Sequence, residues 1–350
     1  MLKKTVLFIC FLISALGIFV CTKNYSIDPI YSNSISGFSG PTFIYTLFDE
    51  NNGENVIKLY INNQNNSSLL SPDNELRSFA RISPDGTKIA YIKNQSLHPW
   101  FGIVKKGTTA LCFTRDMGKT EIILLNDESI NYGSLDWINE TQIALSVYMD
   151  PEYYFQIINI AGVVLYEKKL DSVFKLYVLP NSNYVYLCNN YKFCIFNIAT
   201  SEYREYPVNE NIATYRPPIV VNHELIIKLV DNTYLKYDLD THSYETFLTL
   251  DYNNILIMMN SNEKVFLQQG KESKLVLYQN DEMQKTIAMS NYKCDVGLYL
   301  SEDHILYFVG EVGDDEGGFF KADFNESRIT KLTNHDEKNF IVDFAFYNFN

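Results

Sequence analysis

The stretch RISPDGTKIAYI, residues 81–92, decides the fold. It places a tight polar turn, Ser83-Pro84-Asp85-Gly86, between two short runs of apolar residues. Pro, Asp, Ser and Gly are turn formers, because each supplies a backbone angle or a local hydrogen bond that a tight turn requires. The flanking runs are short and rich in Ile, Ala and Tyr, which is typical of strands. The segment therefore predicts a β-hairpin.

The same order of strand, turn and strand recurs along the chain. Aligned on the first apolar residue after each polar turn, the copies start at Ile89, Ile143, Tyr184, Leu225, Val265 and Ile305. The first interval is 54 residues long and the others are 40 or 41. Each copy continues with a third strand that ends near Asn or Asp and with a short fourth strand. Four strands per unit at this period are typical of a β-propeller blade.

The two ends of the repeat region complete each other. PTFIYTLFDE, residues 41–50, resembles a second strand without a first one, whereas FIVDFAFYN, residues 340–348, has the character of a first strand. We expect residues 340–348 to pair with residues 43–47, because a ring closed in this way has no exposed sheet edge. The count predicts an all-β, seven-bladed propeller of four antiparallel strands per blade, with six or eight blades as alternatives.

SPDGTKIAY resembles the TolB-type propeller repeat, whose best-known form is a Ser-Pro-Asp-Gly turn that leads into an Ile-Ala-Tyr strand. Residues 113–127 and 306–333 are similar to the rest of that repeat. TolB itself carries an α/β domain before a six-bladed propeller, and this chain has only the linker of residues 22–40 at that place. The resemblance implies a propeller of this superfamily, and it does not imply the role of TolB in the Tol-Pal envelope system.

The N-terminal residues differ from the rest in composition. Lys3 and Lys4 precede an apolar run from Val6 to Val20, which predicts an export signal over residues 1–21. Cys21 directly after this run resembles a bacterial lipoprotein signal, which implies a lipid on Cys21. Cleaved secretion and an uncleaved anchor are the alternatives. We expect the signal at 1–21, a linker at 22–40 and the propeller at 41–350, exported to the periplasm or anchored to the membrane at the cell envelope.

Composition limits the class of partner. Aromatic residues make up 15% of the chain, which suits half-buried strands, and the net charge is −13. Such an acidic chain lacks the clustered Lys and Arg that grip nucleic acid, so we expect no nucleic-acid partner. We expect a monomer that binds another envelope protein or an extracellular ligand.

Cys188 and Cys194 flank the turn NNYKF and predict one of two states. Exported proteins form disulfides, so the two thiols are candidates for a bond across neighbouring strands. Buried free thiols that pack as small apolar groups are the alternative. No Cys or His spacing indicates zinc or another metal site.

No pattern in the sequence makes a positive case for catalysis. The five histidines are scattered and form no HxH or HExxH pair, and no GxSxG, P-loop or GxGxxG motif occurs. Sites in a propeller channel assemble from several blades, so spacing alone leaves an enzyme open. A non-catalytic scaffold for proteins or ligands is therefore the main hypothesis, and a lyase-like or glycosidase-like propeller enzyme is the alternative.

Blade 2 carries about 14 extra residues, within residues 94–118. This segment collects aromatic and basic residues in an otherwise acidic chain: Trp100, Phe101, Lys105, Lys106 and Arg115. Loops on a rigid scaffold often carry function, and Trp and Arg are frequent interface anchors. The segment is thus a candidate protein-binding site, and a hairpin packed on its own blade is the alternative.

A second candidate is the loop GEVGDDEGG, residues 310–318, with Asp314, Asp315 and Glu316 among glycines. Oxygen-rich loops can hold Ca²⁺, although the spacing does not match an EF-hand and a solvated acidic loop is the alternative. Similar acidity recurs in residues 48–55 and 149–153. We expect these loops to make one face of the ring negative and attractive to a basic partner.

Overall fold

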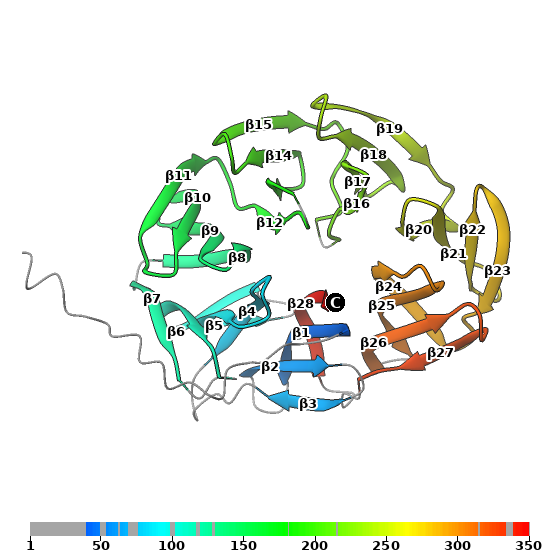
Figure 1. Ribbon diagram of the computed structural model, residues 1–350, viewed down its shortest axis with the longest axis horizontal. Helices are drawn as coiled ribbons and strands as arrows, with labels where there is room; N and C mark the ends of the chain where they lie inside the picture. The colour runs from blue at the N-terminus through cyan, green and yellow to red at the C-terminus, as the bar shows by residue number, and fades with distance from the viewer. Residues whose placement is uncertain are drawn as a thin grey trace, which may run out of the picture. The chain divides into compact units, whose positions relative to one another are not determined.

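A computed structural model describes residues 40–349 except 50–53, 62–63, 69–75, 99–101, 117–119, 128–129, 181, 215, 314–315 and 334–338. The described residues form strands and turns and contain no helix. They fold into seven four-stranded antiparallel sheets arranged in a ring (Figure 1). The prediction of an all-β, seven-bladed propeller is confirmed.

Each blade is a meander, and its first two strands lie nearest the ring axis. The innermost strands of blades 1 to 7 are β28 (Asn339–Phe349), β4 (Arg77–Ile82), β8 (Ile130–Asn139), β12 (Lys175–Val178), β16 (Ile219–Val221), β20 (Asn254–Met259) and β24 (Tyr292–Leu300). The second strands are β1 (Gly40–Asp49), β5 (Ile89–His98), β9 (Gln142–Met149), β13 (Tyr184–Cys188), β17 (Glu224–Lys228), β21 (Glu263–Gln268) and β25 (Ile305–Val312).

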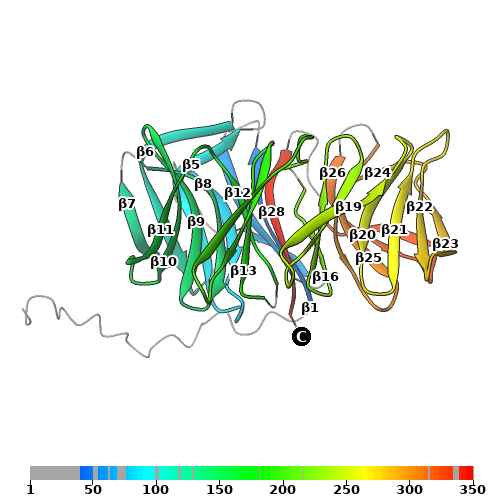
Figure 2. The same cartoon turned by 90° about the horizontal axis from the view of Figure 1, so that it is seen from above.

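The remaining strands complete each sheet outward. The third strands are β2 (Glu54–Ile61), β6 (Gly102–Thr114), β10 (Glu152–Asn159), β14 (Lys192–Asn197), β18 (Thr233–Asp238), β22 (Lys274–Gln279) and β26 (Glu316–Asp323). The outermost strands are β3 (Gln64–Ser68), β7 (Ile122–Asp127), β11 (Val164–Leu170), β15 (Glu202–Pro207), β19 (Ser243–Thr249), β23 (Glu282–Ala288) and β27 (Arg328–Lys331). Figure 2 shows the strands running between the two faces of the ring.

The C-terminal strand closes the ring as predicted. β28 pairs antiparallel with β1, with Phe43 opposite Phe346 and Leu47 opposite Ile341. The two strands lie side by side in Figure 1 although they come from opposite ends of the propeller sequence. The register shifts between Thr46 and Leu47, which leaves Val342 as a bulge on β28.

The Ser-Pro-Asp-Gly turn shows how the sequence makes each hairpin. The amide of Gly86 donates to the carbonyl of Ser83 at 2.8 Å, and Gly86 has a φ of 67°. The Asp85 carboxylate accepts hydrogen bonds from Thr87 and from the Lys88 ammonium. Burial opposes the charge of Asp85, but the hydrogen bonds from Ser83, Thr87 and Lys88 outweigh it and hold its pKa below the usual value. The turn is therefore fixed by its own polar side chains.

A second turn repeats between the third and fourth strands. Asn159, Asn197, Asp238 and Asp323 each end a third strand, and each side chain accepts two backbone amides from the next residues of the turn. Such Asx turns satisfy backbone donors that the strand leaves behind. This explains why Asn or Asp recurs at that phase of the repeat.

Among the described residues, one cluster of buried apolar side chains fills each junction between neighbouring blades. Phe43 of blade 1 packs on Phe319 of blade 7 with 4.6 Å between ring centroids, so packing closes the ring as well as hydrogen bonding does. The junction of blades 5 and 6 has the smallest cluster, built on Ile226, Tyr234 and Leu256. Because these clusters lie between neighbouring blades, they do not fill the space around the ring axis, inside the innermost strands.

Candidate binding site in the central cavity

The innermost strands of the seven blades surround a cavity of about 1820 Å³. Its wall is largely apolar, and its charged side chains include two groups as well as Glu140, Lys175 and Asp240. The first group comes from blades 1 to 3 and the second from blades 5 and 7. A largely apolar cavity with a few placed polar groups is the usual form of a ligand site, and this one is larger than most such sites.

The first charged group is centred on Arg81, whose side chain is only 9% exposed. Its guanidinium donates two hydrogen bonds to the Asp343 carboxylate, at 2.6 and 3.0 Å, and a third to the carbonyl of Ala80. Arg81 lies on β4 and Asp343 on β28, so this bidentate pair joins blade 2 to the closing strand. Burial alone would lower the pKa of Arg81, but Asp343 outweighs that effect and raises it.

Asp136 completes this group from β8 of blade 3. Its carboxylate accepts the backbone amides of Trp137 at 2.9 Å and Val178 at 3.0 Å, and the indole of Trp137 donates to the carbonyl of Arg81. Burial raises the pKa of Asp136 above its usual value, although the charge of Arg81 and the two amides oppose that shift. Arg81, Asp136 and Asp343, here called the closure cluster, thus connect blades 1 to 4.

The second charged group consists of Lys228, Arg216 and Asp295, here called the cationic cluster. All three line the cavity. Lys228 ends β17 in blade 5, Arg216 precedes β16, and Asp295 lies on β24 in blade 7. Burial, together with repulsion from Arg216, lowers the pKa of Lys228 to about 8. The cluster carries two basic groups and one carboxyl group, the reverse of the closure cluster.

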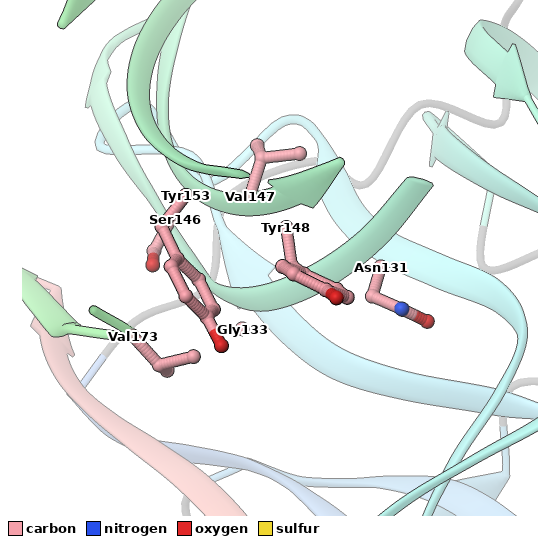
Figure 3. Close-up of a pocket in the computed structure, with 7 residues that line it drawn as sticks. All are labelled: Asn131, Gly133, Ser146, Val147, Tyr148, Tyr153 and Val173. Atoms are coloured by element: carbon pink, nitrogen blue, oxygen red, sulfur yellow. The ribbon is translucent and has the colours of Figure 1, made fainter. Parts of the chain in front are cut away.

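A smaller pocket of about 180 Å³ opens beside the cavity on blade 3. Figure 3 shows the rings of Tyr148 and Tyr153 side by side, with Asn131 on one side and Val173 on the other. The ring centroids lie 4.8 Å apart, and the hydroxyl of Tyr148 donates to Asp150 at 2.9 Å. Gly133 and Val173 line both spaces, so this pocket adjoins the main cavity.

The blade 2 segment forms the extended hairpin of β5 and β6, which accounts for its extra length. Lys105 pairs with Gln95 in the backbone ladder, and Lys106 lies next to it in β6. The guanidinium of Arg115 lies 5.6 Å from the ring centroid of Phe113. Trp100 and Phe101 lie outside the described residues, so the role of this segment as a binding site stays a prediction.

The acidic segments lie where expected, between second and third strands. Residues 150–151 join β9 to β10, and residues 313–315 join β25 to β26. Asp314 and Asp315 fall outside the described residues, and Glu316 begins β26. In the described part of the chain, no three His, Cys, Asp or Glu side chains gather closely enough to hold a metal ion. The Ca²⁺ site stays a prediction.

Of the two states predicted for Cys188 and Cys194, the structure has the free thiols and not the disulfide. Both thiols are free and buried. In the register of β13 and β14, Cys188 lies opposite Phe193 and Cys194 lies opposite Leu187. Because residues one step apart in a ladder point to opposite faces, Cys188 packs between blades 4 and 5 and Cys194 between blades 3 and 4. Burial raises the pKa of both thiols, to about 12 in each case.

Sequence reasoning missed both charged clusters. Their signal is a charged residue inside an apolar inner strand: Arg81 in SFARI, Asp136 in SLDWI and Asp343 in FIVDFAF. Charged residues are rarely buried unless they are paired, so each of these three predicts a partner elsewhere in the chain. The cationic cluster has a weaker signal, because Lys228 stands at a strand end.

Comparison with known proteins supports the fold. No protein-family model matches the sequence, and no curated protein matches it. A solved prolyl endopeptidase is similar over 84% of this chain and 48% of its own, with a TM-score of 0.58 and 9% identity. The β-propeller domain of the Trilobed protease from Pyrococcus furiosus, described as having an open velcro topology, is similar over 86% and 96%, with a TM-score of 0.54 and 14% identity.

TolB from Acinetobacter baumannii is also among the similar structures, with a TM-score of 0.45 and 10% identity over 70% of this chain. This chain spans 62% of that TolB chain and about half of the endopeptidase chain. At these identities the similarity concerns the fold alone. The chain is a seven-bladed β-propeller, as the resemblance to the TolB-type repeat implied. No helix in its described part has the length and apolar character needed to span a bilayer.

Proposed function

We propose that this protein is a non-catalytic scaffold of the cell envelope that binds a ligand in the central cavity of its propeller. The observation that carries the proposal is the cavity of about 1820 Å³ with charged groups set in an apolar wall. Rigid inner strands hold those groups in place, and preorganised groups lower the cost of binding. The ring supplies a platform in which a ligand contacts several blades at once.

The carboxylates of the closure cluster favour binding over hydrolysis. A glycosidase needs two carboxyl groups that act on the substrate as acid and base or nucleophile. Asp343 is engaged by both arms of Arg81, and Asp136 accepts two backbone amides. These contacts hold neighbouring blades together, so the two groups serve structure rather than proton transfer.

The proposal is tested by placing a larger side chain in the cavity and measuring whether the protein still captures a ligand. Val342 lies on the bulge of β28 and lines the cavity, so Val342→Trp narrows it. Tyr252 is 83% exposed on the loop between β19 and β20, so Tyr252→Trp is the matched control. The three chains are incubated with envelope extract and examined by native mass spectrometry, with thermal melts to confirm folding.

We expect a ligand of defined mass on the wild type and on Tyr252→Trp, and none on Val342→Trp. Equal capture by all three folded chains would show that the cavity is not the site. A ligand that leaves the protein with a changed mass would show turnover, and the enzyme alternative would then replace the scaffold.

Export is the second part of the proposal, and it rests on the N-terminal sequence alone. Metabolic labelling with a fatty acid should mark the native chain and leave Cys21→Ser unlabelled. Equal labelling of both chains, or labelling of neither, contradicts the lipoprotein form and leaves cleaved secretion as the proposal.

The long hairpin of blade 2 is the proposed contact for a protein partner. Its third strand β6 has 13 residues, longer than the third strand of any other blade, and its second strand β5 has 10. A central Trp anchor typically contributes about 2 kcal/mol or more to binding. Trp100→Ala should therefore release a captured protein without changing the melt, whereas a lower melt with unchanged capture would identify Trp100 as part of the core.

A further inference from the structure

Lys228 is a half-buried ammonium group that makes no salt bridge with a carboxylate in the described part of the chain. Of the described carboxylates, none lies within 4.0 Å of its Nζ. Its side chain lies on the same face of the sheet as that of Tyr234, directly opposite in the ladder, with Nζ 5.9 Å from the ring centroid. The partly buried lysines Lys93, Lys192 and Lys236, in contrast, all make salt bridges. Burying a cation without an anion is unfavourable, so a structural role does not account for Lys228.

The backbone holds Arg216 close to Lys228. The amide of Ala213 donates to the carbonyl of Lys228 at 2.9 Å, which pairs the segment before β16 with the end of β17. A turn then brings the amide of Arg216 back to the carbonyl of Ala213 at 3.0 Å. Arg216 is close enough to Lys228 for its charge to lower the pKa of the ammonium, and Pro217 and Pro218 stiffen the exit from the turn. Two positive groups thus share one part of the cavity wall.

Asp295 only partly offsets these two charges. Burial raises the pKa of Asp295, and the nearby Glu311 adds to the shift, while Arg216 and Lys293 oppose it. The carboxylate form of Asp295 is therefore disfavoured, and Lys293 and Glu311 make their own salt bridge at 2.9 Å. The cationic cluster thus sets two basic groups against one carboxyl group inside a protein whose net charge is −13.

We propose that Lys228 and Arg216 bind an oxyanion group of the ligand in the central cavity, an inference that rests on the proposed function. The planar guanidinium suits a carboxylate or a phosphate, and the ammonium adds a second positive donor at its side. The largely apolar wall of the same cavity suits an apolar part of the ligand. The ligand class is thus an organic acid or a phosphorylated compound with an apolar or aromatic part.

Titration calorimetry at pH 7 and low salt tests the site with two probes, succinate and inorganic phosphate. The full chain is compared with Lys228→Met and Arg216→Met, which keep most of the apolar stem. The control is Lys271→Met, because Lys271 is exposed between β21 and β22 and its loss changes the net charge equally. Thermal melts establish that all four chains are folded.

We expect at least one probe to bind at one saturable site. Lys228→Met and Arg216→Met should each lower the affinity for that probe about tenfold or more, and Lys271→Met should leave it unchanged. Preference for succinate would indicate a carboxylate ligand, and preference for phosphate a phosphorylated one. No saturable binding, or equal weakening by Lys271→Met, would overturn the proposal.

The outcome separates this inference from the proposed function. If Val342→Trp releases the captured ligand while Lys228→Met binds it as the wild type does, the cavity is a binding site without the oxyanion contact. If neither substitution affects capture, the cavity itself is not the site.

Discussion

The two charged clusters of the cavity wall are built from similar groups and are used differently. Arg81 donates two hydrogen bonds to Asp343 across the join between blade 2 and the closing strand. Lys228, on the other part of the ring, has an aromatic ring and a second cation as its close neighbours. A buried cation with a matched anion holds blades together, whereas a buried cation beside another cation is suited to a ligand. The comparison indicates that the closure cluster stabilises the ring, whereas the cationic cluster in the same cavity wall is suited to binding.

Removing the whole closing strand should have the largest effect. Deletion of residues 339–350 removes the only partner of the inner edge of β1 among the described strands, together with Asp343. It also removes the partly buried Phe344 and Phe346 from the junction of blades 1 and 7. We expect loss of the cooperative urea transition and of the near-UV circular dichroism.

A synthetic peptide of residues 339–350 added to the truncated chain should restore part of the signal, because β28 contributes strand pairing, packing and the ion pair of Asp343, none of which needs a covalent link. A truncated chain that unfolds cooperatively at the wild-type midpoint would show that the ring does not depend on its closing strand.

Arg81→Met should cause the second-largest loss of stability. It leaves Asp343 buried and unpaired, which typically costs about 3–5 kcal/mol of the free energy of unfolding. The measurement is the urea midpoint at pH 7. The double substitution Arg81→Met with Asp343→Leu should recover part of the loss, because Asp343 is then no longer buried unpaired, while Asp136 loses the charge of Arg81 and keeps its two backbone amides. If the double variant is as unstable as the single one, packing rather than charge explains the effect.

The sequence predicts the fold well because the fold is made locally and repeated. Turns such as Ser83 to Gly86 and the Asx turn at Asn197 depend on residues within four positions of one another. Their recurrence sets the phase of every blade. The closing strand could also be predicted, since β1 lacked an inner neighbour and residues 340–348 supplied one.

The site was not predictable in the same way, because its members meet only after the ring closes. Arg81 and Asp343 are 262 positions apart, and no local pattern relates them. The sequence also left the state of Cys188 and Cys194 open between a disulfide and free thiols, and strand register decides it. Cys188 and Cys194 do lie on paired strands, but their register differs by one residue, which places the thiols on opposite faces of the sheet.

Lys228→Met should change stability in the opposite direction to Arg81→Met. Methionine keeps most of the apolar stem and removes a half-buried charge that Arg216 repels. We expect the free energy of unfolding to rise by up to about 1 kcal/mol, measured as a higher urea midpoint with an unchanged slope. A loss of stability similar to that of Arg81→Met would show that Lys228 is paired structurally, and the contrast between the clusters would then fail.

The smallest expected effect is a change in the pH dependence of stability. The pKa of Lys228 is about 8 in the folded protein, against 10.5 ordinarily, because of burial and Arg216. Between these values the unfolded chain holds the proton and the folded chain releases it, so stability rises with pH across that window. The destabilisation caused by the buried ammonium is therefore complete below pH 8 and disappears as the pH rises toward 10.5.

The gap in urea midpoint between the wild type and Lys228→Met should therefore narrow from pH 7 to pH 10, since other titrating groups are common to both chains. Succinate binding should weaken over the same range, because the Lys228 ammonium loses its charge. A gap that stays constant with pH would mean that Lys228 titrates as an ordinary exposed lysine.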